Sequence, residues 1–284
     1  MNLMNSIAAP AWVAGLKVVT SKCEHCHRSM ALRSFSARKA GIKMGSGWYC
    51  SSSCFTAGAE RKFSEMLKPS PERTARFSRM PLGLSLINRG LLTRIQFKEA
   101  VDEQKEAGGE IGELLVRHGS VSEEQVTSVL AALWGCPVFS VPKQVPPSGV
   151  HIPSALIRLY SAIPLHYVAA TRLLLVGFVH GIEYGLLYAI EQITGCKTQP
   201  CFVTPSDFQS QMQHMTLVEE RLGAIVPREL NVESAEDPAE MASILCGYGV
   251  DLEAEEATIG RCMEFVWARL KSGPREFDLL FKAG

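Results

Sequence analysis

Hydrophobic residues recur with different periods in different parts of the chain. Over residues 82–133 they return every three or four positions, which predicts amphipathic helices. Residues 173–179 form a continuous apolar run of strand length, and residues 197–203 predict a second strand. Between these strands, residues 183–193 predict a helix that ends at Gly195. The pattern therefore indicates a helical region followed by a compact α/β unit.

A second helix start follows the predicted strands. Thr204 supplies a hydroxyl cap, Pro205 fits the first helical position, and Asp207 places an acid in the first turn. Residues 216–238 are polar, acidic and interrupted by prolines, which predicts an exposed linker.

The C-terminal segment predicts a small α+β unit. Residues 238–249 have the spacing of a helix, and residues 259–270 and 276–281 predict the two strands of a closing hairpin. A helix over residues 257–270 is the alternative for the first of these strands.

The helical region contains an internal repeat with an offset of 29 residues. Each copy begins with a short apolar segment and a glycine, Gly90 or Gly119, which can adopt the left-handed conformation that stops a helix. A hydroxyl residue and a glutamine then form a capping box that starts a longer helix. The matched positions are Leu82 and Ile111, Gly83 and Gly112, Leu86 and Leu115, Thr93 and Ser122, and Gln96 and Gln125. Two such hairpins predict a quasi-symmetric bundle.

Four of the nine cysteines form two closely spaced pairs near the start of the chain, Cys23 with Cys26 and Cys50 with Cys54. Two such pairs supply the four thiolates that zinc accepts in a closed tetrahedral site. The first pair is predicted in a turn and the second at the start of a helix, which resembles a treble-clef zinc finger. A site closed by four thiolates has no open coordination position, so we expect a structural role.

Two alternatives remain for these cysteines. His25 or His27, beside the first pair, would replace one thiolate as a ligand. Alternatively, the four residues are unrelated thiols, an interpretation that leaves their paired spacing unexplained. The other cysteines are scattered singly and are predicted to be core thiols.

Charge is distributed unevenly along the chain, although 29 basic and 29 acidic residues cancel. Residues 1–78 carry 12 basic and 4 acidic residues, a net charge of +8, whereas residues 215–284 carry 7 and 14, a net charge of −7. A basic N-terminal module offers a second functional interpretation, in which residues 22–62 bind nucleic acid. The basic residues concerned are Arg28, Arg33, Arg38, Lys39, Lys43, Arg61 and Lys62.

Composition excludes several classes of protein. The chain is 46% hydrophobic and 20% charged, which excludes a largely disordered protein. Its longest apolar run is far shorter than the roughly 20 residues of a membrane span. Residues 7–16 are mostly apolar but follow no basic residue, so we expect no signal peptide. Together with the cysteine pairs, these features predict a cytoplasmic protein without membrane insertion.

The repeat and the segments after it resemble a known family. From Leu82 the first copy reads Leu-Gly-x-x-Leu-Ile-x-x-Gly-x-Leu-Thr, followed by Gln-Phe-x-x-Ala-Val-x-x-Gln ending at Gln104. Ile-Pro pairs follow at residues 152–153 and 163–164. This ordered set is similar to the N-terminal, GspE/MshEN-type domain of type II secretion and type IV pilus assembly ATPases, over residues 80–215.

The resemblance implies a nucleotide site on the repeat, because MshEN-type domains bind cyclic-di-GMP there. The implied binding positions in this chain are Leu82, Gly83, Leu86, Gln104, Ile111, Gly112 and Leu115. The family's leading arginines are replaced by Pro81 and Glu110, and its second closing glutamine by Leu133. An anionic dinucleotide thereby loses cationic partners. Either Arg79 or Arg117 substitutes from a shifted position, or the leucines and glycines only pack the bundle.

Taken together, the patterns predict a multidomain α+β fold in several segments. They are a zinc-binding module (1–67), a linker (68–79), a GspE/MshEN-like domain (80–215, with helical repeats 80–135 and an α/β unit 136–215), a linker (216–238) and a small α+β segment (239–284).

Motifs for catalysis are missing from the sequence. It contains no phosphate loop, nucleophile elbow, Gly-x-Gly-x-x-Gly fingerprint or His-Glu-x-x-His motif. We therefore predict a non-catalytic bacterial adaptor that binds protein partners in secretion, pilus or signalling machinery. A zinc-dependent nucleic-acid-binding regulator and a true cyclic-di-GMP receptor are the alternatives.

Overall fold

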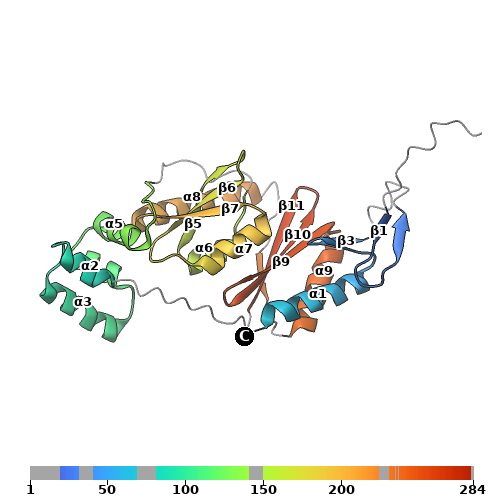
Figure 1. The fold of residues 1–284 in the computed structure, drawn as a ribbon, viewed down its shortest axis with the longest axis horizontal. Helices are drawn as coiled ribbons and strands as arrows, with labels where there is room; N and C mark the ends of the chain where they lie inside the picture. Colours follow the sequence, from blue (N-terminus) through green and yellow to red (C-terminus); the bar gives the residue numbers. More distant parts are fainter. Residues whose placement is uncertain are drawn as a thin grey trace, which may run out of the picture.

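The computed structural model describes residues 20–31, 41–68, 81–140, 150–223, 230–233, 235 and 237–282. They form helices together with sheets of two, three and six strands, which confirms the α+β class. Figure 1 shows an elongated molecule, with the helical repeats at one end, the three-stranded sheet in the middle and the six-stranded sheet beyond it.

The internal repeat forms two helical hairpins. Their helices are α2 (Leu82–Asn88), α3 (Arg94–Ala107), α4 (Ile111–Arg117) and α5 (Glu123–Trp134). Both predicted capping boxes are present, at Thr93 for α3 and Ser122 for α5. Gly90 and Gly119 have φ values of 71° and 68°, so they end α2 and α4 in the left-handed conformation. Helix α2 packs on α5 and α3 on α4, so the two copies interlock.

The α/β unit follows the hairpins along the chain. Its elements are α6 (Ser154–Leu159), β5 (Ala162–Val168), β6 (Leu173–Phe178), α7 (Tyr184–Thr194), β7 (Lys197–Phe202) and α8 (Pro205–Gly223). Strand β6 pairs antiparallel with β5 and parallel with β7, so α7 is the crossover between two parallel strands. Buried residues of α5 and β6 belong to one core. We call the described residues of 81–223 the repeat lobe.

The six-stranded sheet combines strands from both ends of the chain. Its order is β4 (Gly47–Tyr49), β3 (Ile42–Met44), β9 (Glu256–Cys262), β10 (Phe265–Ser272), β11 (Arg275–Lys282) and β8 (Leu230–Glu233). Helices α1 (Ser52–Leu67) and α9 (Pro238–Asp251) pack against each other beside it. The short hairpin of β1 (Thr20–Lys22) and β2 (Ser29–Ala31) lies at the far end (Figure 1). We call these described elements the sheet lobe.

Three expectations from the sequence are corrected here. Residues 216–238 are not a plain linker, since α8 continues to Gly223 and β8 pairs with β11. Residues 259–270 contain parts of two strands, β9 and β10, rather than one strand or a helix. The cysteine-rich and C-terminal segments are not separate modules, because β3 pairs parallel with β9.

Strands β10 and β11 bury both of their faces. Val266 and Phe281 contribute to the core beside α1 and α9, whereas Trp267 and Leu280 contribute to the core of the repeat lobe. Helix α7 contacts β9 and β10. The alternation of side chains along these strands thus joins the two lobes. None of the helices formed by the described residues combines the length and hydrophobicity of a bilayer crossing.

Candidate functional site: a four-cysteine cluster and a pocket in the repeat lobe

The two predicted cysteine pairs come together in the sheet lobe. The sulfur atoms of Cys23, Cys26, Cys50 and Cys54 all lie within 4.8 Å of one another. Cys50 Sγ lies 3.5 Å from Cys26 Sγ and 3.8 Å from Cys54 Sγ. Tetrahedral zinc with Zn–S bonds of about 2.3 Å places its sulfurs about 3.8 Å apart. The cluster therefore has the donor atoms and the spacing to hold a metal ion, and neither neighbouring histidine belongs to it.

Local structure explains how the cysteines converge. Cys23 follows β1, and Cys26 lies in the turn that leads to β2. The β3–β4 hairpin delivers Cys50, whose backbone amide approaches Cys23 Sγ at 3.5 Å. Ser51 caps α1 by accepting a 3.3 Å hydrogen bond from the amide of Cys54. This order of turn, hairpin and helix brings the four cysteines together.

The pKa values of Cys23 and Cys50 are shifted in opposite directions. Burial disfavours the Cys23 thiolate, but backbone amides of Cys26, Cys50 and His25 outweigh it and lower the pKa of Cys23 to about 6. The side-chain hydrogen bond of Cys50 to Cys26, followed by burial, raises the pKa of Cys50 to about 12. Four crowded thiols cannot all ionise without a nearby cation. A bound metal would supply that positive charge.

The basic residues around the cluster are partly neutralised. Lys43 Nζ lies 3.3 Å from a Glu256 carboxylate, and Lys62 Nζ lies 3.6 Å from Glu65. Residues 32–40, which carry Arg33, Arg38 and Lys39, lie outside the described residues. The described part of the module thus gives the nucleic-acid interpretation no support.

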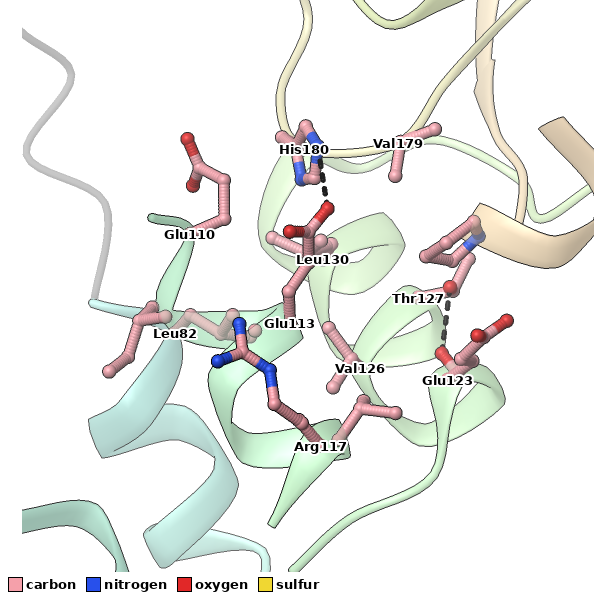
Figure 2. Close-up of a pocket in the computed structure, with 14 residues that line it drawn as sticks. Leu82, Glu110, Glu113, Arg117, Glu123, Val126, Thr127, Leu130, Val179 and His180 are labelled. Atoms are coloured by element: carbon pink, nitrogen blue, oxygen red, sulfur yellow. Dashed lines mark hydrogen bonds and ion pairs between the residues drawn. The ribbon is translucent and has the colours of Figure 1, made fainter. Parts of the chain in front are cut away.

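A second site is a pocket of about 300 Å³ in the repeat lobe. It lies where the second helical hairpin meets the loop after β6 and the start of α8 (Figure 2). Its lining residues are Leu82, Glu110, Ile111, Gly112, Glu113, Val116, Arg117, Glu123, Val126, Thr127, Leu130, Val179, His180 and Pro205. The pocket therefore combines an apolar surface with several charged groups.

The positions implied for a nucleotide divide into two groups. Leu82, Ile111 and Gly112 line the pocket. Leu86 and Leu115 are fully buried in the core. A Cβ atom on Gly83 would lie 2.0 Å from the ring of Phe97, so this glycine lets α2 approach α3. Gln104 Nε2 donates a 2.8 Å hydrogen bond to the carbonyl of Gly109, which fastens the spacer between the two copies.

The replaced arginine positions lie at helix starts. Pro81 is the N-cap of α2, and Glu110 is the N-cap of α4. Arg117, the candidate substitute, places Nη1 3.0 Å from a Glu103 carboxylate oxygen. Arg79 lies outside the described residues. The one guanidinium among the described lining residues is thus already paired with a carboxylate.

The α/β unit contributes one wall of the pocket, formed by lining residues that the sequence did not predict. Val179 and His180 follow the end of β6, and Pro205 follows the end of β7. Ligand sites in α/β proteins form beyond the carboxyl ends of parallel strands. Because β6 and β7 are parallel, their ends were the signal that could have indicated this wall.

Buried charges connect the two lobes at a third location. Arg269 and Asp278 are each only 2% exposed, and Arg269 Nε donates to Asp278 Oδ1 at 2.8 Å. Trp267 Nε1 also donates to Asp278 Oδ1, at 2.8 Å. Arg269 Nη2 donates to the carbonyl of His151 in the repeat lobe at 2.8 Å. The network satisfies the buried pair and fixes the junction between the lobes.

Comparison with known proteins supports the family resemblance. The chain is 27% identical over 129 residues to the type IV pilus assembly ATPase PilB of Thermus thermophilus. The predicted GspE/MshEN-type domain is confirmed. The match covers 45% of this chain and only 14% of PilB, so the chain spans a small part of that relative's length. No family model matches the chain.

Two solved structures that match this chain have low overall similarity to it. A structure of MshE with cdg is 20% identical, covers 48% of this chain and 98% of that chain, and has a TM-score of 0.39. A structure of the N-terminal domain of XpsE is 18% identical, covers 51% and 98% of the two chains, and also has a TM-score of 0.39.

Proposed function

We propose that the protein is a non-catalytic adaptor whose GspE/MshEN-type domain binds a protein component of secretion or pilus machinery. The PilB match carries this proposal, because it relates 45% of the chain to a pilus assembly ATPase. The 284 residues contain no phosphate loop with which to hold ATP. Binding without hydrolysis requires only the surface of such a domain.

The proposal includes a structural zinc ion in the four-cysteine cluster. Four thiolates fill every position of tetrahedral zinc, so the metal would contribute folding free energy and no Lewis acid chemistry. Its ligands would be Cys23, Cys26, Cys50 and Cys54. The order of turn, hairpin and helix around these residues supports this ligand set. Cysteine pairs remain available as metal ligands, rather than forming disulfides, in a reducing compartment, so we place the adaptor in the cytoplasm.

Helix α7 supplies the surface that we propose for the secretion or pilus protein. Tyr184 and Tyr188, one turn apart, are 58% and 61% exposed. The ring of Trp134 lies 6.4 Å from that of Tyr184. Exposed tyrosine and tryptophan side chains are enriched at protein interfaces. Met263, 43% exposed, packs beside the same helix at Gly185.

Quantitative affinity capture of the full chain from its bacterial host tests this function. We expect secretion or pilus assembly proteins to be enriched over a tagged control. The double variant Tyr184→Ser with Tyr188→Ser should lose them, because both aromatic anchors disappear. Val250→Ser is the matched control, since Val250 is 57% exposed on α9 in the other lobe.

Two results would overturn the proposed adaptor function. One is a capture in which secretion and pilus proteins are not enriched. The other is an ATP or nucleotide turnover that co-purifies with the protein and disappears in a point variant.

A further inference from the structure

The charge of the repeat-lobe pocket suits a different ligand from the one implied by the family. Its surface is apolar around Leu82, Val126, Leu130 and Val179. Its volume of about 300 Å³ suits a small ligand or one long side chain. Such a pocket favours the aliphatic part of a ligand through burial of hydrocarbon surface.

Carboxylates dominate the charged groups around this surface. Glu110, Glu113 and Glu123 line the pocket, against the single guanidinium of Arg117. Arg117 is already paired with Glu103, which lies outside the pocket lining. Three carboxylates thus line the pocket, while its one described guanidinium is paired with a fourth carboxylate outside it, so the lining has an excess of negative charge.

The individual carboxylates are held in different ways. Glu113 extends toward His180, whose Nε2 lies 3.4 Å from its carboxylate (Figure 2). Glu123 accepts hydrogen bonds from the amide and hydroxyl of Ser206, at 3.1 and 2.7 Å. Glu110 stands at the start of α4, apart from Glu113 and Glu123 (Figure 2). Glu113 and Glu110, which accept no hydrogen bond from Ser206, thus have the greater capacity to accept hydrogen bonds from a ligand.

We propose that this pocket binds an aliphatic cation, an ammonium or guanidinium group carried on a short hydrocarbon stem. The stem would lie against Val126 and Leu130, and the cationic head would face Glu113 and Glu110. Charge-assisted hydrogen bonds to carboxylates are stronger than neutral ones in a partly enclosed site. The side chain of a lysine or arginine on a partner protein and a free alkylamine share this chemistry. The pocket would take either one whether or not the protein acts as an adaptor.

Three probes of similar shape and different charge test the proposal. They are butylguanidinium, its neutral analogue butylurea, and the anion pentanoate, each titrated into the full chain labelled with nitrogen-15. Butylguanidinium should shift the amide resonances of Gly112, Val126 and Leu130 in a saturable manner. Butylurea should bind about tenfold more weakly or worse, and pentanoate should give no saturable shift. Equal shifts from butylguanidinium and butylurea, or tighter binding of pentanoate, would overturn the proposal.

Charge variants locate the cationic head. Glu113→Gln should weaken butylguanidinium binding by about tenfold while leaving butylurea unchanged. Glu106→Gln, an exposed position on α3 outside the pocket lining, is the matched control and should change nothing. An unchanged affinity in both Glu113→Gln and Glu110→Gln would place the cation elsewhere and refute the site.

A competition experiment distinguishes the two sources of the cation. Saturating butylguanidinium should release captured secretion or pilus proteins if one of their basic side chains occupies the pocket. Partners that stay bound, together with saturable butylguanidinium binding, would assign the pocket to a free alkyl cation. Failure of the adaptor function would leave the probe titrations interpretable, because these need no partner protein.

Discussion

The repeat lobe and the sheet lobe are built from opposite kinds of contact. In the repeat lobe, helices α2 to α5 pack against one another within residues 82–134, and each copy of the repeat has the same helix-capping box. In the sheet lobe, β3 pairs with β9, and Lys43 contacts Glu256 across a sequence separation of 213 residues. Local contacts form with little loop-closure entropy, whereas the sheet requires both ends of the chain to meet. The sheet lobe therefore depends on bonds that hold distant segments together.

Three such bonds can be identified in the structure. The four-cysteine cluster brings the turn after β1 to the start of α1. Arg261 of β9 donates to the carbonyls of Met66 and Lys68 at 2.8 and 2.9 Å, which satisfies the end of α1. The Arg269–Asp278 pair then joins the sheet to the repeat lobe through His151. Damage to any of them should affect the sheet lobe more than the repeat lobe.

The largest expected effect comes from Cys50→Ser. Removing one thiolate should abolish binding of about one zinc per chain, and structural zinc contributes about 10–16 kcal/mol of binding free energy in small modules. Because β3 pairs with β9 and α1 packs on α9, the C-terminal strands should lose hydrogen-exchange protection too. Helices α3 and α5 should keep theirs. Metal analysis and hydrogen exchange are the measurements.

Cys246→Ser is the control for this experiment, because Cys246 is half-buried on α9 outside the cluster. Zinc content that is unchanged in Cys50→Ser would contradict the proposed ligand set. Equal loss of hydrogen-exchange protection in both lobes would contradict the greater dependence of the sheet lobe on the cluster.

The next largest effect is expected for Asp278→Asn. The change leaves the Arg269 guanidinium buried without its main counter-charge, since Glu276, 3.3 Å from Nη1, is the one carboxylate still paired with it among the described residues. Removing one partner of a buried pair costs about 3–5 kcal/mol, and the remaining Glu276 argues for the lower end of that range. Chemical denaturation followed by tryptophan fluorescence measures it. Asp251→Asn, exposed on α9, should cost almost nothing, and a similar cost for both variants would contradict the role of the network.

A binding prediction tests the repeat lobe. The family resemblance implies that Pro81 and Glu110 replace ligand-binding arginines, so the unaltered chain should give no saturable cyclic-di-GMP binding in titration calorimetry. Each charged hydrogen bond is worth about 1.5–3 kcal/mol, or roughly tenfold or more in affinity. Pro81→Arg combined with Glu110→Arg should therefore restore measurable binding. Tight binding by the unaltered chain would show that Arg117 or Arg79 has taken over the missing contacts.

The same contrast explains what the sequence could and could not predict. Capping boxes such as Thr93 with Gln96 are local signals, and the structure has them where predicted. The pairing of β3 with β9 leaves no local trace, and the turn at Met263, with a φ of 54°, carries no glycine to mark it. The convergence of the cysteines followed from their spacing. The pocket wall at His180 could not be predicted from spacing, because it depends on where the ends of β6 and β7 lie relative to the helical repeats.

The smallest effect concerns Tyr160, at the junction between the lobes. Its hydroxyl is buried and has no hydrogen-bond partner among the described residues, and burial raises the pKa of Tyr160. Tyr160→Phe removes an unsatisfied polar group, which should raise the free energy of unfolding by about 1 kcal/mol. In the unaltered protein the unfolded tyrosine loses its proton first, near its ordinary pKa of about 10, so stability should fall as the pH rises through that value. The advantage of the phenylalanine variant should therefore grow above about pH 10. Tyr188→Phe, at a 61% exposed position, should leave the free energy of unfolding at neutral pH unchanged. A loss of stability in Tyr160→Phe would mean that the Tyr160 hydroxyl has a partner at the junction.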